Sequence, residues 1–118
     1  MSTFEPWSYR EGAGYTEGAD LTGYKIAATD GDIGKVDRAT YETGQASIVV
    51  DTGPWIFGRK VMLPAGVVER IDHEDRKVYV DLNKDEIKDA PEFDPDTGDD
   101  ADYRNRLGTY YGDRYRGL

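Results

Sequence analysis

Turn-forming residues recur at short intervals through the middle of this 118-residue chain. Between residues 24 and 82, pairs and triplets rich in Gly, Asp and Pro separate strand-length segments rich in Val, Ile and Tyr. In two of these segments, 46–51 and 77–82, apolar residues alternate with a more polar set. That period predicts strands with one buried and one wetter face, arranged as an antiparallel meander of about six strands.

A short all-β chain has a physical reason to close its sheet, because a closed barrel leaves no exposed strand edge. After the last strand, Asn83 and Glu86 are spaced as a capping box, which predicts one helical turn that ends before Pro91. We therefore predict an all-β fold, namely a small antiparallel β-barrel of about six strands, with a short helical turn and flexible termini.

Composition divides the chain into three regions. Residues 1–20 are rich in Gly, Ser, Thr and Glu without a sustained period, which predicts a flexible N-terminal arm. Residues 21–93 form the predicted barrel. Residues 94–118 are predicted to be a tail that is first acidic and then rich in Tyr and Arg; segment 89–102 carries −7 and segment 103–118 carries +3 of the net charge of −9.

The residue counts restrict the chemistry open to this chain. It has no Cys and a single His, so disulfides, cysteine zinc sites and multi-histidine metal sites are excluded, and we expect neither a cofactor nor a metal. The acidic run 94–100 fails the spacing of a calcium-binding loop and favours a solvated linker. His73, beside Glu74 and Asp75, has the alternatives of a pH sensor or base and of an exposed turn residue.

No apolar run is long enough for a secretion signal or a membrane-spanning helix, so we expect a cytoplasmic protein without an integral membrane segment. The overall acidity would repel a phosphate backbone, which disfavours general nucleic-acid binding. The basic C-terminal end is a local exception.

Several short motifs follow one another between residues 21 and 93. They are Leu21-Thr22-Gly23-Tyr24-Lys25, Asp30-Gly31-Asp32-Ile33-Gly34-Lys35-Val36, Val61-Met62-Leu63-Pro64 and Ala90-Pro91. In this order they resemble the PRC-barrel domain family, in its short stand-alone bacterial form. Known members include the cytoplasmic domain of the reaction-centre H subunit and the barrel of a ribosome-maturation factor.

The resemblance implies a small barrel that docks onto a protein or ribonucleoprotein partner and has no catalytic residues. It also implies that Gly31 and Gly34 mark the family's first hairpin, where a side chain would impede the turn. We count Gly58 and Pro64 with them as structural turn residues.

Two groups of residues are candidate contact sites. Trp55, Ile56 and Phe57 place three large apolar side chains in a Gly-bounded turn, which favours an exposed contact surface over a lid on one barrel end.

The second group is Tyr110, Tyr111 and Tyr115 in the Tyr/Arg tail, which could stack on bases or anchor a partner. Its alternatives are a disordered tail and a tail that folds back on the acidic segment. We favour a tail that orders on the barrel or on a neighbouring copy.

The function predicted from these features is a non-catalytic protein-interaction and self-association module. We expect a homo-oligomer, because a core this small often recruits a second copy. We also expect the chain to bind an unidentified protein partner. The alternative is a ribosome- or RNA-associated factor that acts through the Tyr/Arg tail. A third class, small-molecule binding or catalysis in the barrel mouth, is disfavoured because small barrels are filled by their own side chains.

Overall fold

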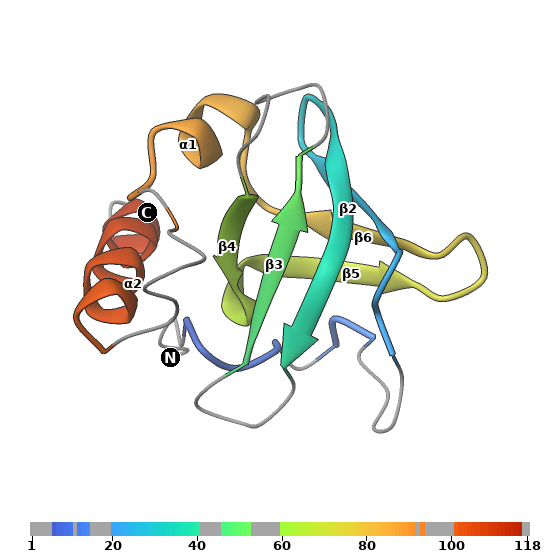
Figure 1. The fold of residues 1–118 in the computed structure, drawn as a ribbon, viewed down its shortest axis with the longest axis horizontal. Coiled ribbons are helices and arrows are strands. Elements are labelled where there is room, and N and C mark those ends of the chain that lie inside the picture. Colours follow the sequence, from blue (N-terminus) through green and yellow to red (C-terminus); the bar gives the residue numbers. More distant parts are fainter. Residues whose placement is uncertain are drawn as a thin grey trace.

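The computed structural model describes residues 6–10, 12–14, 20–40, 46–52, 60–91, 93 and 101–116, with side chains of the last helix as far as Asp113. In this part of the chain, strands dominate and one long helix follows them (Figure 1). The elements are β1 (Lys25–Ala28), β2 (Gly31–Thr40), β3 (Ser47–Asp51), β4 (Lys60–Pro64), the 3₁₀ helix η1 (Ala65–Val67), β5 (Val68–Asp72), β6 (Lys77–Val80), α1 (Lys84–Lys88) and α2 (Ala101–Arg116).

The six strands form one sheet in the order β4-β3-β2-β1-β6-β5, which confirms the predicted all-β class and strand number. All neighbours are antiparallel except β1 and β6, which run parallel. The sheet curls so that β2 and β3 run across the direction of β5 and β6 (Figure 1). It is not closed by strand pairing: β4 and β5 are its two edges, and η1 connects them.

The core fills the concave side of this curled sheet. Its fully buried members come from every strand and include Ile26, Ile33, Ile48, Val50, Leu63, Val68, Val78 and Val80. Strand β6 shows the predicted alternation of buried and partly exposed residues. Strand β3 does not: Ser47 and Val49 are buried together with Ile48 and Val50, so the prediction of a wetter face is wrong for this strand. Both of its faces are covered.

The N-terminal segment, in residues 6–10 and 12–14 of the region predicted to be an arm, lies against the sheet. The carbonyl oxygens of Trp7 and Pro6 accept from the amides of Ala46 and Gly66, at 2.9 and 2.8 Å. The carbonyl of Ala13 accepts from the amide of Ile71 in edge strand β5 at 2.7 Å. These bonds satisfy backbone donors that an open sheet would leave unpaired.

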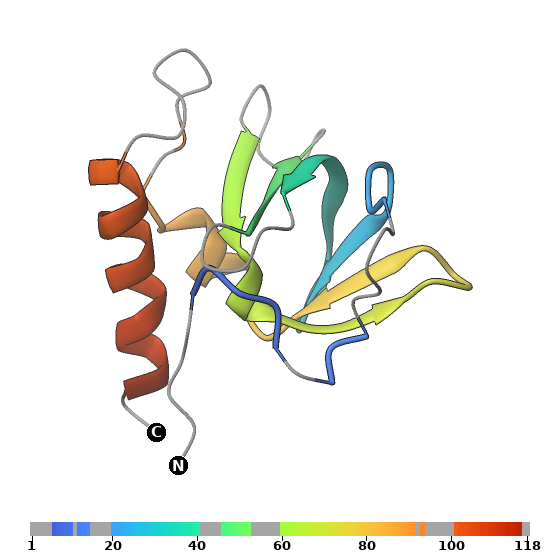
Figure 2. The same ribbon diagram turned by 90° about the horizontal axis from the view of Figure 1, so that it is seen from below.

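In the predicted C-terminal tail, residues 101–116 form helix α2. The N-terminal segment and α1 lie between α2 and the sheet (Figure 2). The predicted capping box of α1 is confirmed: the Asn83 side chain accepts from the amide of Glu86 at 2.8 Å, and the Glu86 carboxylate accepts from the amide of Asn83 at 2.9 Å.

Two of the glycines assigned to turns have positive φ angles, +141° at Gly31 and +147° at Gly34. Gly34 lies at an irregularity in the β1–β2 pairing, opposite Ile26. A Cβ at Gly34 would collide with the backbone of Asp51 in β3, so only glycine lets β2 and β3 approach each other there. Pro64 ends β4 and precedes η1. Gly58 lies outside the described residues.

Candidate functional site

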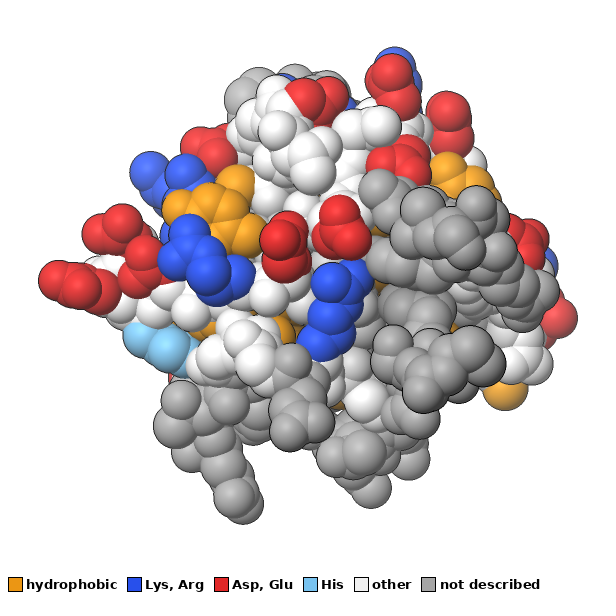
Figure 3. Space-filling model, turned by 180° about the vertical axis from the view of Figure 1, so that it is seen from behind, with side chains coloured by type: hydrophobic (Ala, Val, Ile, Leu, Met, Phe, Trp, Pro, Cys, Tyr) orange, Lys and Arg blue, Asp and Glu red, His pale blue; other side chains and the backbone are white. Residues whose placement is uncertain are grey.

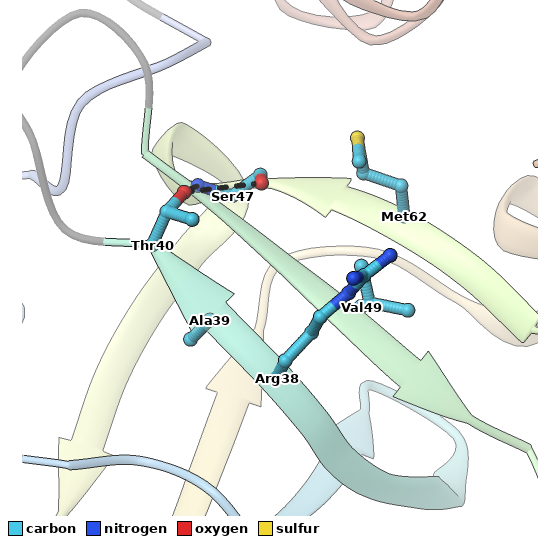
Figure 4. A pocket seen from close by; sticks show the side chains of 6 residues that line it. All are labelled: Arg38, Ala39, Thr40, Ser47, Val49 and Met62. Atoms are coloured by element: carbon cyan, nitrogen blue, oxygen red, sulfur yellow. Dashed lines mark hydrogen bonds between the residues drawn. The ribbon is translucent and has the colours of Figure 1, made fainter. Parts of the chain in front are cut away.

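A cavity of about 160 Å³ lies on the face formed by β2, β3 and β4. The residues that line it are Arg38, Ala39, Thr40, Ser47, Val49 and Met62 (Figure 4). The strand register brings these residues together, since Arg38 pairs with Val49, Val49 with Met62, and Thr40 with Ser47. We call this surface the β2–β4 face.

The bottom of the cavity is apolar and one side of it is charged. Val49 and Met62 are 4 % and 3 % exposed, whereas Arg38 is exposed to solvent. The Arg38 side chain extends from β2 toward Val49 (Figure 4). Among the residues that the structure describes, no carboxylate lies within ion-pair distance of Arg38. A guanidinium in this position can form paired hydrogen bonds with a planar anion.

Two hydroxyl groups stand at the other end of the cavity. The Oγ1 of Thr40 and the Oγ of Ser47 are 3.3 Å apart, and Thr40 Oγ1 also accepts from the amide of Ser47 at 3.1 Å. Arg104 of α2 donates to the Ser47 Oγ at 3.4 Å. The cavity therefore has an apolar base, two hydroxyls and two guanidinium groups within or beside it, a set suited to hold an anion with an apolar part.

The position of Arg104 depends on how α2 packs. Its guanidinium lies 4.3 Å from the centre of the Trp7 ring, a distance typical of a cation–π contact. On the same helix Gly108 lies against Trp7, because a Cβ there would stand 3.3 Å from the indole nitrogen. Tyr103, Leu107 and Tyr111, spaced by four residues, are buried along one side of the helix. The N-terminal segment thus supports the helix that brings Arg104 to the site.

The structure places the predicted contact residues in different situations. Trp55, Ile56 and Phe57 lie outside the described residues, as does the side chain of Tyr115. Tyr111 is 1 % exposed and packs edge-on against Tyr110 at a centroid distance of 5.0 Å. Both tyrosines therefore contact their own chain, and Tyr111 presents no surface to a partner in this arrangement.

Tyr110 anchors α2 to α1. Its hydroxyl donates to the carbonyl of Glu86 at 2.7 Å. Burial raises the pKa of this hydroxyl above its ordinary value, and the nearby carboxylates of Asp89 and Glu86 raise it further because they oppose a second negative charge.

His73 is exposed yet hydrogen-bonded through both ring nitrogens. Nδ1 shares a hydrogen bond with the Tyr24 hydroxyl at 3.1 Å, and Nε2 donates to the carbonyl of Gly14 at 2.8 Å. The imidazole thus connects the β5–β6 turn to Tyr24, the residue before β1, and to the N-terminal segment, which is a structural use of the ring.

Within the described part of the chain, no group of three or more His, Asp or Glu side chains is arranged to hold a metal ion. Among the same residues, no helix is both long and apolar enough to cross a membrane.

Sequence reasoning did not identify Arg38, Ser47 or Arg104 as site residues. One signal was present: Ser47 is a small polar residue in a strand with the composition of a buried one, and it stands opposite Thr40. The approach of Arg104 depends on the packing of α2 against Trp7, which no local pattern reveals.

The fold and the site define a small β-domain with an open, curled six-stranded sheet, a C-terminal helix packed on its N-terminal segment, and a polar-rimmed cavity on the β2–β4 face. No protein-family model and no curated protein sequence matches the chain. Among solved structures, the chain is similar to one from Pseudomonas aeruginosa described as RimM, a 16S ribosomal RNA processing protein, with 27 % identity and a TM-score of 0.46. The match covers 55 % of this chain and 42 % of that one.

Proposed function

We propose that this chain is a non-catalytic interaction module that binds a protein partner on the β2–β4 face and associates with itself. One observation carries the proposal: Arg38 stands beside a cavity floored by Val49 and Met62, without a carboxylate partner among the described residues. A concave apolar site with few polar groups at its rim is the usual form of a binding site. The chain has a net charge of −9, yet the Arg38 guanidinium faces no carboxylate among the described residues, so it is suited to bind an anionic group of another molecule.

The proposal assigns no reaction to the chain. The only histidine, His73, has both ring nitrogens in hydrogen bonds with Tyr24 and Gly14 and lies in the β5–β6 turn, not among the residues that line the cavity. The hydroxyls of Thr40 and Ser47 have arginines near them, which do not act as general bases because the guanidinium stays protonated.

Affinity capture with three forms of the full chain tests partner binding. The wild type, Arg38→Glu and Arg70→Glu are compared in lysate with and without nuclease. Arg70 is the matched control because it is an exposed strand arginine on β5, away from the cavity. We expect a protein that is retained by the wild type and by Arg70→Glu after nuclease and is lost with Arg38→Glu. A set of captured proteins that is the same for all three forms would contradict the assignment to this face.

Self-association rests on the small size of the core and on the apolar turn Trp55, Ile56 and Phe57, which lies outside the described residues. Sedimentation velocity over a hundredfold range of concentration tests it. We expect the weight-average sedimentation coefficient to increase with concentration; a monomer at every concentration would refute this part of the proposal.

A second candidate is association with RNA or the ribosome, and a cation–aromatic cluster on the β5–β6 hairpin favours it. The Arg70 guanidinium lies 4.2 Å and the Lys77 amine 5.6 Å from the centre of the Tyr79 ring. Such groups bind phosphates and stack on bases. Acidic side chains border basic ones on the face seen in Figure 3, which weakens the attraction for a polyanion.

The tail is a poorer RNA site in this structure than the sequence suggested, because the rings of Tyr103 and Tyr111 are buried. Fluorescence anisotropy with a structured RNA at low salt tests the second candidate. Binding that Arg70→Gln weakens and added salt abolishes would support it, and no binding at low salt would end it.

A further inference from the structure

We infer that the cavity on the β2–β4 face binds the C-terminal residue of a partner polypeptide, that is, a carboxylate carried next to a compact apolar side chain. The inference rests on the proposed function and specifies the chemistry of the partner. In it, the terminal carboxylate pairs with Arg38, and the apolar side chain lies on Val49 and Met62.

The volume of the cavity limits the group that enters. About 160 Å³ is close to the roughly 150 Å³ of an engineered apolar cavity in another protein that binds one benzene molecule. The space therefore accepts a single ring or branched aliphatic side chain.

The charge around the cavity selects the sign of the ligand. Five other basic side chains of the described residues face carboxylates of the same chain: Arg10, Lys60, Arg70, Lys77 and Arg106. Among the described residues Arg38 faces no carboxylate, and neither do Lys25, Lys35, Arg76 and Lys88, but of these it is Arg38 that lines the cavity. An external carboxylate would supply the missing partner and form two parallel hydrogen bonds with the guanidinium.

The hydroxyls add to this recognition. Thr40 Oγ1 and Ser47 Oγ line the same cavity 3.3 Å apart, and the Arg104 guanidinium is 3.4 Å from Ser47 Oγ. A hydroxyl both donates and accepts, so either group can rotate its proton toward a carboxylate oxygen.

A chain terminus fits this site better than an acidic side chain within a chain. Asp and Glu carry their carboxylates on one or two methylene groups, which leave the surface of Val49 and Met62 without an apolar contact. An internal residue also needs two routes by which its chain leaves the cavity. A terminal Leu, Val, Ile or Phe enters end-on and offers the carboxylate and the apolar group together.

Methionine NMR provides a direct test on the full chain. The chain has two methionines, Met1 and Met62, and Met62 lines the cavity. The protein is labelled with ¹³C at the methionine methyl groups, and Met62→Leu assigns the signal. N-acetyl-L-leucine is titrated against N-acetyl-L-leucinamide, which has the same side chain without the charge. We expect the acid to shift the Met62 signal with saturation and the amide to leave it nearly unchanged.

One variant and a matched control test the role of Arg38. Arg38→Gln should weaken binding of N-acetyl-L-leucine about tenfold or more, as expected for loss of a charged hydrogen-bond partner. Lys25→Gln, an exposed basic residue on β1 that does not line the cavity, should leave the affinity unchanged. A Met62 signal that does not move, that moves equally with acid and amide, or that responds equally in Arg38→Gln would overturn the inference.

A further titration distinguishes the sources of the carboxylate. The peptide Gly-Ser-Gly-Leu with a free C-terminus is compared with isovalerate, a free acid with a similar apolar group. Tighter binding of the peptide supports a polypeptide C-terminus. Tighter or equal binding of isovalerate overturns that source and assigns the cavity to a small free acid.

Failure of this inference is distinguishable from failure of the proposed function. Suppose that Arg38→Glu no longer captures a protein but N-acetyl-L-leucine does not shift the Met62 methyl signal. The assignment of partner binding to the β2–β4 face would then be supported, and the carboxylate inference would be refuted. If the acid shifts the Met62 methyl signal but the wild type captures no protein, carboxylate binding in the cavity would be supported and the interaction function would be refuted.

Discussion

The Nε2 atom of His73 lies 2.8 Å from the carbonyl oxygen of Gly14, a residue 59 positions earlier in the chain. Because a carbonyl can only accept, the proton is on Nε2, and Nδ1 is left to pair with the hydroxyl of Tyr24. The same backbone stretch is bonded to β5 once more, through the amide of Ile71 and the carbonyl of Ala13. One side chain thus helps to fasten the N-terminal segment along the edge of the sheet.

Replacement of His73 should loosen that segment. For His73→Ala we expect a loss of about 1 kcal/mol in the free energy of unfolding, the typical value of a net hydrogen bond. We also expect faster hydrogen exchange at the Ile71 amide, because its acceptor is no longer held in place. Tyr24→Phe is the control that removes only the Nδ1 partner. Unchanged exchange at Ile71 in His73→Ala would mean that the segment is held without the histidine.

Gly34 and Gly23 provide a matched pair for the cost of a side chain at positive φ. Both have positive φ angles, +147° and +86°, but a Cβ at Gly23 would meet open space, whereas one at Gly34 would meet the backbone of Asp51. We expect Gly34→Ala to lower the free energy of unfolding by about 3 kcal/mol or more, through strain and overlap together. Gly23→Ala should cost about 1 kcal/mol. Urea denaturation of the two variants measures the difference, and equal losses would contradict the overlap.

Local patterns predicted the elements whose stability is decided locally. Residues 77–80 alternate as a strand with one buried face, and the Asn83 and Glu86 spacing predicted the capped turn of α1. The second buried face of β3 was not predictable in this way, because burial of Val49 and Ser47 arises only in the folded chain, where Arg104, distant in sequence, reaches Ser47.

Helix α2 shows the same limit. Tyr103, Leu107 and Tyr111 have helical spacing, but the helix also contains two glycines and follows a strongly acidic run. Its packing partners, Trp7 and Phe93, lie outside it in the sequence. The cavity depends on those contacts as well, since Arg104 reaches Ser47 only when α2 is in place. The spacing of the turns predicted the strand number, but neither that spacing nor the PRC-barrel resemblance predicted this helix or the site.

Tyr110 should make the stability of the protein sensitive to alkaline pH. Its pKa is raised above the ordinary value of 10.0, so the folded protein holds this proton more tightly than the unfolded chain does. The stabilisation is therefore complete below pH 10 and is lost as the pH rises through the folded pKa. We expect the free energy of unfolding to fall over this range, and to fall less in Tyr110→Phe. Urea denaturation between pH 8 and 11 measures how the free energy of unfolding changes with pH in the wild type and in Tyr110→Phe. The same change in both proteins would contradict the assignment of this pH dependence to Tyr110.

Leu107 tests whether α2 is an integral part of the fold. It is fully buried on the side of the helix that packs against the rest of the chain, between Tyr103 and Tyr111. Leu107→Ala removes buried methyl groups and leaves a cavity, so we expect a loss of about 2–5 kcal/mol in the free energy of unfolding.

Asn105→Ala, on the exposed side of the same helix, is the control and should change the free energy of unfolding by no more than about 0.5 kcal/mol. Denaturation followed by fluorescence of Trp7 and Trp55 and by far-ultraviolet circular dichroism should give coincident transitions if helix and sheet unfold together. If Leu107→Ala were as stable as Asn105→Ala, or if the helix signal were lost in a separate early transition, α2 would be an appendage and not part of the cooperative unit. Arg104 would then be held near Ser47 only weakly, and the site on the β2–β4 face would depend on Arg38 alone for its positive charge.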